Sequence, residues 1–227
     1  MLCSAKVWAA SAWTGPGSGP NFRMFRSTGF DIAMTSFKTF PQSIKGPLVI
    51  WKDVFTAQEL DAIEAHGDSL MPMRAEISGA KQTTDHARIT RVAWMQRNAE
   101  TAWLYARLEE AVLHLNAQFY KFDLFGLNES LQYTVYDGVE GGHYNWHVDL
   151  GAKTVEPRKI SLSLQLTDPS GYEGCNLVLE AGEGPYVAER ARGTLIAFPS
   201  YVLHRVSPIE SGVRKSLVIW VSGPEFR

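Results

Sequence analysis

The 227-residue sequence lacks the features that mark secreted and membrane proteins. It has only two cysteines, Cys3 and Cys175, and this count favours a reducing compartment over a scaffold held by disulfides. No apolar run approaches the roughly 18 residues that a membrane-spanning helix needs. The longest runs are Leu48–Trp51 and Leu217–Val221. We therefore expect a cytoplasmic protein with no membrane partner.

Charge of one sign is not in excess either. The chain carries 22 Lys and Arg against 24 Asp and Glu, which gives a formal net charge of −2. Sequence-independent binding to nucleic acid depends on clustered positive charge, so no nucleic-acid partner is expected. Hydrophobic residues make up 45% and charged residues 20%, proportions that are ordinary for a globular enzyme with a buried core.

The chain is expected to divide near residue 40. Gly15–Pro20 consists of glycine, serine and proline, and we expect residues 1–40 to form a flexible extension. Met24 and Met34 are alternative candidate starts of the native protein. No second break in composition follows, so residues 41–227 are expected to form a single domain. No oligomeric state is predicted.

Two helices are predicted in the first half of this domain. Thr56 and Glu59 form a capping box that predicts a helix start, and Gly67 is the predicted end of that helix. Asn98 is the predicted N-cap of a longer helix, in which apolar residues recur at three- and four-residue spacing as far as Phe119. The polar residues between them are expected to face water: Arg107, Glu109 and Glu110.

Short strands separated by turns are predicted in the rest of the domain. The segments are Pro47–Val54, Arg88–Met95, Ser130–Tyr136, His143–Asp149, Arg158–Thr167, Asn176–Glu180, Thr194–Phe198, Leu203–Ser207 and Arg214–Ser222. Because helices come first and many short strands follow, we expect a mainly β fold with flanking α. The specific form is a double-stranded β-helix, or jelly roll, with helices packed on one sheet. The polar stretch Lys81–Arg91 is either a lid over a site or, more simply, a surface loop.

Two histidines and one carboxylate are spaced as the protein ligands of a metal. His147 and Asp149 are two residues apart in a predicted strand and so project from the same face, while Val148 packs on the other side. His204 must come from a distant strand that the roll brings alongside. Such a set binds Fe(II) and leaves the opposite face of the metal open for substrate and oxygen. The alternative is that both histidines are ordinary core residues, but the glycine-rich turn before His147 weighs against it.

An arginine ten residues after His204 supports a co-substrate site. In the strand that begins at Arg214, the side chains of Arg214, Ser216 and Trp220 share one face. An arginine that points into the roll is costly unless an anion meets it, and the distal carboxylate of 2-oxoglutarate supplies that anion. Ser216 can add a hydrogen bond. In the alternative, Arg214 faces outward and Lys215 inward, or both side chains are solvated.

A series of motifs follows one order along residues 130–224. They are Tyr136, Gly141-Gly142, Tyr144–Asp149, the arginine-led strand Arg158–Leu166, the hairpin Tyr172–Cys175, Pro199-Ser200, and His204 with Arg214. This order resembles the Fe(II)- and 2-oxoglutarate-dependent oxygenases of the prolyl 4-hydroxylase-like group, which includes the bacterial PKHD-type hydroxylases. The first half of the chain resembles that group only as a strand–helix lead-in.

The resemblance implies the cofactors Fe(II), 2-oxoglutarate and O2, with ascorbate as a candidate reductant. No catalytic residue beyond the metal ligands is implied. Two positions depart from the group: Cys175 stands where it has a second glycine, and Gln165 where several prolyl hydroxylases have a tyrosine. The resemblance implies His147, Asp149 and His204 for the metal, Arg214 and Tyr136 for 2-oxoglutarate, and Tyr144 for the substrate pocket. Ser216 is added to the 2-oxoglutarate set from its place on the face of Arg214, and Gln165 and Trp220 are further candidates for the pocket.

The implied activity is hydroxylation of an unactivated C–H bond in a protein residue such as proline, an amino acid or a small metabolite, with release of succinate and CO2. Small molecules and peptides are therefore the expected partners. One alternative is a non-catalytic jelly-roll module of the cupin type, although cupins bind metal mostly with several histidines and a glutamate. Another is a nucleic-acid demethylase of the same chemistry. Those enzymes have a second arginine six residues after the first, where this chain has Trp220.

Overall fold

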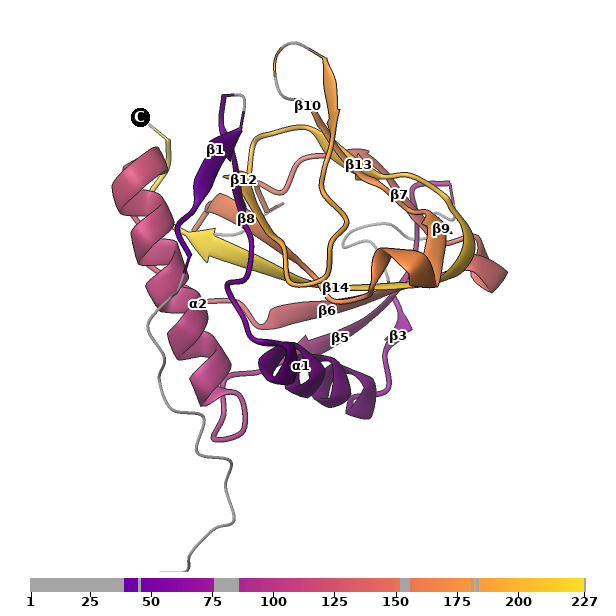
Figure 1. The fold of residues 1–227 in the computed structure, drawn as a ribbon. Coiled ribbons are helices and arrows are strands. Elements are labelled where there is room, and N and C mark those ends of the chain that lie inside the picture. Colours follow the sequence, from indigo (N-terminus) through magenta and orange to yellow (C-terminus); the bar gives the residue numbers. More distant parts are fainter. Residues whose placement is uncertain are drawn as a thin grey trace, which may run out of the picture. The chain divides into compact units, whose positions relative to one another are not determined.

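The computed structural model describes residues 39–44, 46–75, 86–151, 156–180, 182 and 184–226 (Figure 1). The predicted extension over residues 1–40 lies almost wholly outside these ranges, as do residues 81–85 of the candidate lid. Among the helices of the described ranges, none is long and apolar enough to cross a membrane.

Two antiparallel sheets form the roll. Within the described residues, the main sheet has nine strands in the order β1-β2-β12-β8-β14-β6-β5-β3, with β9 pairing β14. Their bounds are β1 Gln42–Ile44, β2 Leu48–Trp51, β3 Met73–Arg74, β5 Arg91–Met95, β6 Leu131–Asp137, β8 Arg158–Gln165, β9 Tyr172–Gly174, β12 Leu195–Pro199 and β14 Ile209–Ser222.

The second sheet has the order β11-β10-β13-β7-β4. Its strands are β4 Arg88–Ile89, β7 His143–His147, β10 Leu177–Glu180, β11 Pro185–Val187 and β13 His204–Val206. In both sheets, strands from early and late in the sequence lie side by side. This interleaving is the double-stranded arrangement that the strand pattern predicted, so the predicted fold class is confirmed.

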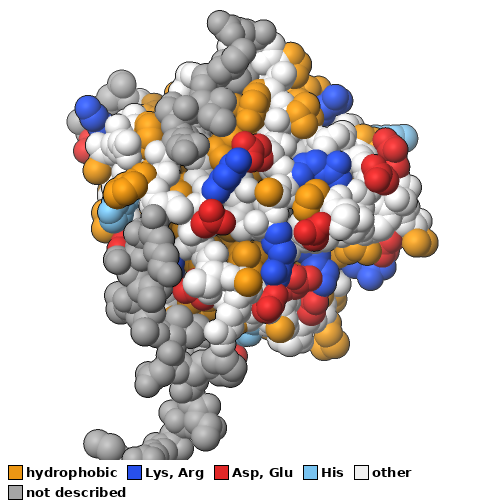
Figure 2. Space-filling model, viewed as in Figure 1, with side chains coloured by type: hydrophobic (Ala, Val, Ile, Leu, Met, Phe, Trp, Pro, Cys, Tyr) orange, Lys and Arg blue, Asp and Glu red, His pale blue; other side chains and the backbone are white. Residues whose placement is uncertain are grey.

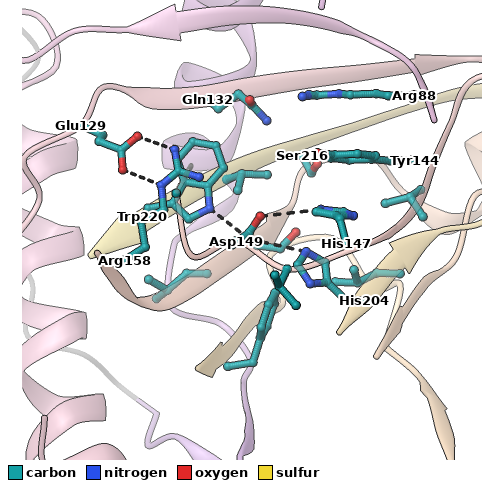
Figure 3. Close-up of a pocket in the computed structure, with 18 of the residues that line it drawn as sticks. Arg88, Glu129, Gln132, Tyr144, His147, Asp149, Arg158, His204, Ser216 and Trp220 are labelled. Atoms are coloured by element: carbon teal, nitrogen blue, oxygen red, sulfur yellow. Dashed lines mark hydrogen bonds and ion pairs between the residues drawn. The ribbon is translucent and has the colours of Figure 1, made fainter. Parts of the chain in front are cut away.

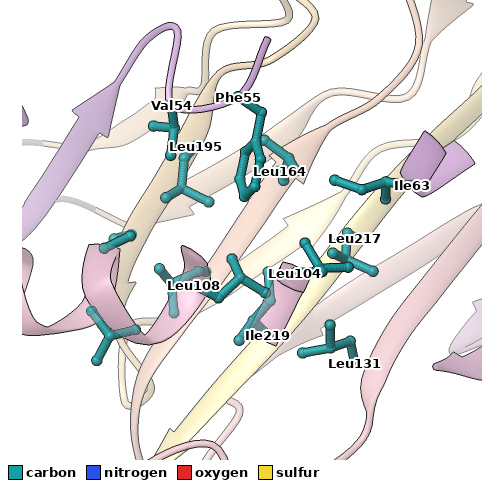
Figure 4. Packing of buried hydrophobic residues seen from close by; sticks show 14 of the residues in the cluster. Val54, Phe55, Ile63, Leu104, Leu108, Leu131, Leu164, Leu195, Leu217 and Ile219 are labelled. Carbon is teal, nitrogen blue, oxygen red and sulfur yellow. The ribbon is translucent and has the colours of Figure 1, made fainter. Parts of the chain in front are cut away.

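Two helices, α1 (Ala57–Ser69) and α2 (Ala102–Leu115), flank the main sheet (Figure 1). A π-helical turn over Asn116–Tyr120 follows α2 directly, and short 3-10 turns cover Gly138–Glu140 and Pro169–Gly171. The apolar stripes of both helices pack against strand residues (Figure 4). Each such side chain contributes about 1.5–3 kcal/mol when it leaves water. Members of this layer are Ile63, Leu104, Leu108, Leu131, Leu164, Leu195, Leu217 and Ile219.

The helix starts and stops differ in part from the prediction. The capping box of α1 is confirmed, because Thr56 Oγ1 accepts from the Glu59 N–H and Glu59 Oε2 accepts from the Thr56 N–H. Gly67, however, lies inside α1 rather than at its end. A Cβ there would stand 2.4 Å from Cδ2 of Tyr133, so this glycine permits close packing of the helix on β6.

The second helix begins three residues later than expected. Thr101 is the residue before α2, and Asn98 caps the preceding turn by accepting from the N–H groups of Glu100 and Thr101. Arg107 was expected to face water but is only 7% exposed. Its Nη2 donates to the Val54 carbonyl at 2.7 Å, because the segment between β2 and α1 covers this part of the helix.

The predicted strand Arg88–Met95 is divided between the two sheets. Its first part, β4, pairs with β7, and its second part, β5, pairs with β6. Thr90 lies at the change of sheet, where its hydroxyl donates to the Val135 carbonyl at 2.8 Å. The division brings Arg88 beside Tyr144 on the second sheet, next to the predicted site.

Candidate metal centre and co-substrate pocket

The three predicted metal ligands lie together (Figure 3). His147, at the end of β7, pairs directly with His204, at the start of β13. Asp149 follows β7, and its backbone N–H donates to the Ser200 carbonyl at 2.8 Å. One ligand atom from each residue lies within 4.8 Å of the others, so the group can hold a metal ion. The carboxylate is 3.6 Å from His147 Nε2 and 3.5 Å from His204 Nε2.

Hydrogen bonds set both imidazole rings for ligation. Nδ1 of His147 lies 2.7 Å from the Asn145 carbonyl, and Nδ1 of His204 lies 2.9 Å from the Val202 carbonyl. A carbonyl only accepts, so each Nδ1 carries the proton and each Nε2 keeps a lone pair for a metal. Burial and the neighbouring His204 lower the pKa of His147 to about 4, which keeps its ring neutral at pH 7.

The carboxylate of Asp149 is held by two donors. The Trp220 indole N–H donates to Oδ2 at 3.0 Å, and the Ser161 hydroxyl donates to the same atom at 2.9 Å. Burial opposes the charged form, but the two histidines and these donors hold the pKa of Asp149 below its ordinary value. Asp149 is therefore ionised and oriented. Ser161 was not predicted, although the polar residues at every second position of β8 (Ser161, Ser163) were a readable signal.

A cavity of about 480 Å³ opens between the sheets at this group. It contains Trp220 and Tyr144, which were predicted to line a substrate pocket, and Tyr144 stacks on His147 with 3.6 Å between ring centroids. The lining is Arg88, Trp94, Glu129, Gln132, Tyr136, Tyr144, His147, Val148, Asp149, Gly151, Arg158, Leu162, Ser163, Leu177, Phe198, His204, Val206, Arg214, Ser216, Val218 and Trp220.

Arg214 points into this cavity and Lys215 away from it. Arg214 is 2% exposed, and its Nη1 is buried without a hydrogen-bond partner in the described structure. Lys215 Nζ lies on the helix side of β14, 2.9 Å from Glu64 and 2.7 Å from Asp68. A buried guanidinium nitrogen with no acceptor fits a ligand carboxylate, which would satisfy it with a charge-assisted hydrogen bond.

The other predicted co-substrate residues surround Arg214. Tyr136 is paired with it across β6 and β14, with the Tyr136 ring centre 5.6 Å from the guanidinium carbon. Burial raises the pKa of Tyr136 to about 12, so its hydroxyl stays protonated and can donate. Ser216 lines the cavity two residues beyond Arg214. Gln165 is not among the lining residues, because its amide oxygen turns to the guanidinium and accepts from Nη2 at 2.8 Å and Nε at 3.2 Å.

Cys175 occupies a backbone position that favours glycine, the residue that the prolyl 4-hydroxylase-like group has there. Its backbone φ is +52°, in the left-handed region where a side chain costs about 1–2 kcal/mol. The preceding Gly174 also has a positive φ, of 71°. The cysteine is free and buried in the apolar cluster between the sheets, together with Tyr136 and Tyr172. Its side chain therefore helps to form the wall behind Arg214.

The C-terminal half of the chain matches a known family. Residues 131–222 match the family model of the 2OG-Fe(II) oxygenase superfamily. A PKHD-type hydroxylase of Aliarcobacter butzleri is 39% identical over 87 residues, which are 36% of this chain and 38% of the relative. The PKHD-type hydroxylase YbiX of Escherichia coli O157:H7 is 32% identical over 125 residues, 52% of this chain and 54% of the relative. The match to this chain thus spans about half, or less, of the length of these relatives.

Solved structures share the fold. A prolyl-4-hydroxylase of Pseudomonas putida superposes with a TM-score of 0.64 at 20% identity, covering 79% of this chain and 94% of that one. A prolyl hydroxylase of Trichoplax adhaerens, in complex with a peptide fragment of the hypoxia inducible factor oxygen degradation domain, gives 0.65 at 14% identity, covering 78% and 84%. The resemblance that the motif order indicated is confirmed by these matches.

Proposed function

We propose that this protein, whose residues 131–222 match the 2OG-Fe(II) oxygenase superfamily, is an Fe(II)- and 2-oxoglutarate-dependent hydroxylase. One observation carries the proposal: a single cavity contains both the three-ligand group and a buried arginine nitrogen for which the described part of the chain offers no acceptor. The reaction would release succinate and CO2 and place a hydroxyl group on an unactivated carbon of an amino acid, peptide or small metabolite.

The donor set suits Fe(II). His147, Asp149 and His204 would hold the ion by two imidazole nitrogens and one carboxylate, which leaves one side of the ion for other ligands. The bound ion would supply the activation of O2 that is coupled to oxidation of the 2-oxo acid. Trp220 and Ser161 keep the carboxylate in place during this chemistry, because they hold the Oδ2 atom at hydrogen-bond distance.

The co-substrate would lie between the metal group and Arg214. The distal carboxylate of 2-oxoglutarate would accept from Arg214 Nη1, while Gln165 holds the other side of the guanidinium. The hydroxyl groups of Tyr136 and Ser216 stand ready as further donors. Trp220 and Phe198 line the cavity and would restrict how a substrate approaches the metal.

The finer points of the function are also proposals. The peptide in the Trichoplax structure belongs to that enzyme and supports a peptide as one candidate substrate here. Ascorbate would serve as the reductant that keeps the iron ferrous. A cytoplasmic location and the absence of a nucleic-acid partner are proposed on composition alone.

The test is conversion of 2-oxoglutarate to succinate by the purified protein with Fe(II) under air. We expect succinate to form, and we expect Asp149→Ala to abolish it. A non-catalytic cupin-type module would bind metal yet yield no succinate, and that result would reject the proposal. Lys215→Ala is the matched control, since Lys215 lies next to Arg214 but contacts α1 instead of the cavity.

A further inference from the structure

A second guanidinium in the cavity has no counter-ion among the described residues. Arg88 lines the same cavity as Arg214, and its Nε and Nη2 atoms are buried without a hydrogen-bond partner. Arg158 also lines the cavity, but it donates to both carboxylate oxygens of Glu129, so its charge is already met. Unfilled guanidinium N–H groups in a buried setting cost free energy unless a ligand supplies an acceptor.

Arg88 lies close to the candidate metal group. Its guanidinium carbon is 4.7 Å from the centre of the Tyr144 ring, and that ring stacks on His147 at 3.6 Å. The ring of Tyr144 thus contacts both the Arg88 guanidinium and the ring of His147, a candidate metal ligand. Figure 3 shows Arg88 beside Tyr144, with its guanidinium end toward Gln132. A carboxylate bound to Arg88 would therefore leave room for only a short carbon skeleton between itself and the three-ligand group.

With Fe(II) and 2-oxoglutarate bound, the charge of Arg88 would have no negative partner among the described residues of the cavity. The two positive charges of Fe(II) and the one of Arg214 are balanced by Asp149 and the two carboxylates of 2-oxoglutarate. Arg158 and Glu129 balance each other, and His147 and His204 would bind a metal as neutral imidazoles. Among the described residues that line the cavity, Arg88 is then the charge that remains. One further negative charge would neutralise the cavity.

We propose that the prime substrate carries a carboxylate and that Arg88 binds it. This inference rests on the proposed function and names the substrate class of that same site. The short reach from Arg88 to the metal favours a small acid whose reacting C–H lies a few bonds from its carboxylate. Gln132 lies alongside as a further polar contact, and the packed indoles of Trp94 and Trp220, with ring centroids 6.2 Å apart, form an apolar wall for the carbon skeleton.

The experiment uses the whole protein with Fe(II) and 2-oxoglutarate. One arm offers the free amino acids and short aliphatic acids, each beside its own primary amide. The other arm offers N-acetylated, C-amidated peptides containing Asp or Glu, each beside its Asn or Gln counterpart. Substrate-stimulated succinate and the gain of one oxygen atom in the product are measured. Binding is followed separately, under nitrogen, by the shift in thermal unfolding midpoint.

We expect a carboxylate in one arm to stimulate turnover and bind at least about tenfold more tightly than its amide, which corresponds to about 1.4 kcal/mol. The arm that responds identifies a free acid or an acidic peptide as the source. Arg88→Gln should abolish the preference for acid over amide and leave the KM for 2-oxoglutarate within about twofold, and Arg88→Lys should retain part of the preference. Arg91→Gln is the charge-matched control, because Arg91 is exposed and paired with Glu140.

Several results would overturn the assignment. They are equal response to acids and amides, no response to any carboxylate in either arm, an unchanged preference in Arg88→Gln, or a rise in the KM for 2-oxoglutarate in that variant. Thermal unfolding of each variant shows that it is folded, and Arg88→Lys tests the charge if the glutamine variant is not. Failure of the proposed function looks different, since the wild-type protein loaded with metal would then not bind 2-oxoglutarate at all.

Discussion

The two faces of the main sheet carry different chemistry, and β14 shows the difference within one strand. On the helix side, Lys215 meets two carboxylates of α1, and the residues next to it in that layer are apolar. On the cavity side, Arg214 keeps a buried nitrogen with no acceptor among the residues that the structure describes. The helix side satisfies its own groups and stabilises the fold, whereas the cavity side leaves groups for a ligand. The alternating residues are Lys215, Leu217 and Ile219 against Arg214, Ser216 and Trp220.

Loss of a ligand on the cavity side should have the largest effect. Asp149→Ala removes the only carboxylate of the three-ligand group, so we expect Fe(II) binding and succinate formation to fall to background. The loss of iron affinity should be larger than the roughly 10–100-fold loss that follows removal of a residue that hydrogen-bonds to a metal ligand. Metal binding is measured by anaerobic titration, with Lys215→Ala as control. Near-normal iron affinity in Asp149→Ala would show that these side chains do not form the metal site.

Arg214 and Lys215 carry the same charge but lie on opposite faces of β14, so substituting each of them tests the difference between the two faces directly. Arg214→Ala should raise the KM for 2-oxoglutarate by roughly a hundredfold, or about 3 kcal/mol, because a charge-assisted contact to the buried ligand is lost. Lys215→Ala should leave that KM unchanged and lower only the thermal midpoint. Steady-state kinetics measures both values, and equal increases in KM would show that the assignment of faces is wrong.

Trp220 should have a smaller effect, exerted through Asp149. Trp220→Phe keeps the aromatic wall and removes the indole N–H that donates to Oδ2, so we expect iron affinity to fall by about tenfold. Trp94→Phe is the matched control, because it changes the neighbouring indole and leaves both donors to Asp149 in place. If the two variants bind iron equally well, the hydrogen bond does not contribute to the metal site.

The helix side should affect stability and leave the site intact. Leu108 of α2 is fully buried, and Leu108→Ala should lower the free energy of unfolding by about 2–5 kcal/mol through lost burial and a cavity. The KM for 2-oxoglutarate of the folded fraction should not change. Urea unfolding and kinetics at low temperature measure the two quantities. A large rise in KM would mean that the two faces are coupled.

Local rules were sufficient for much of the fold and for the centre of the site. The capping box at Thr56 and the apolar stripe of α2 follow from residue spacing. His147 and Asp149 do meet, but β7 ends at His147, and Val148 lines the same cavity instead of packing on the other side. The inward direction of Arg214 needed one further premise, that a buried charge requires a counter-ion. These features depend on neighbours in the sequence, and so the sequence alone could predict them.

What sequence missed depends on contacts between distant segments. Gly67 reads as a helix end, yet it is required by the ring of Tyr133. Arg107 reads as water-facing until the segment before α1 is folded over it. An alternating pattern does not show that residues 88–95 are divided between two sheets. It therefore does not predict that Arg88 pairs with Tyr144. Gln165 was predicted for the substrate pocket from its position in the resemblance. Its hydrogen bonds to Arg214 arise from the pairing of β8 with β14, which the sequence does not show.

The central claim is that Arg214 is reserved for the distal carboxylate of the co-substrate beside the metal group. Calorimetric titration of the iron-loaded, oxygen-free protein with 2-oxoglutarate and with 2-oxobutyrate, which lacks that carboxylate, tests it most directly. We predict that the wild-type protein binds 2-oxoglutarate about a hundredfold more tightly than 2-oxobutyrate, a difference of about 3 kcal/mol, and that Arg214→Ala binds the two alike. A preference of the same size in Arg214→Ala would contradict the account.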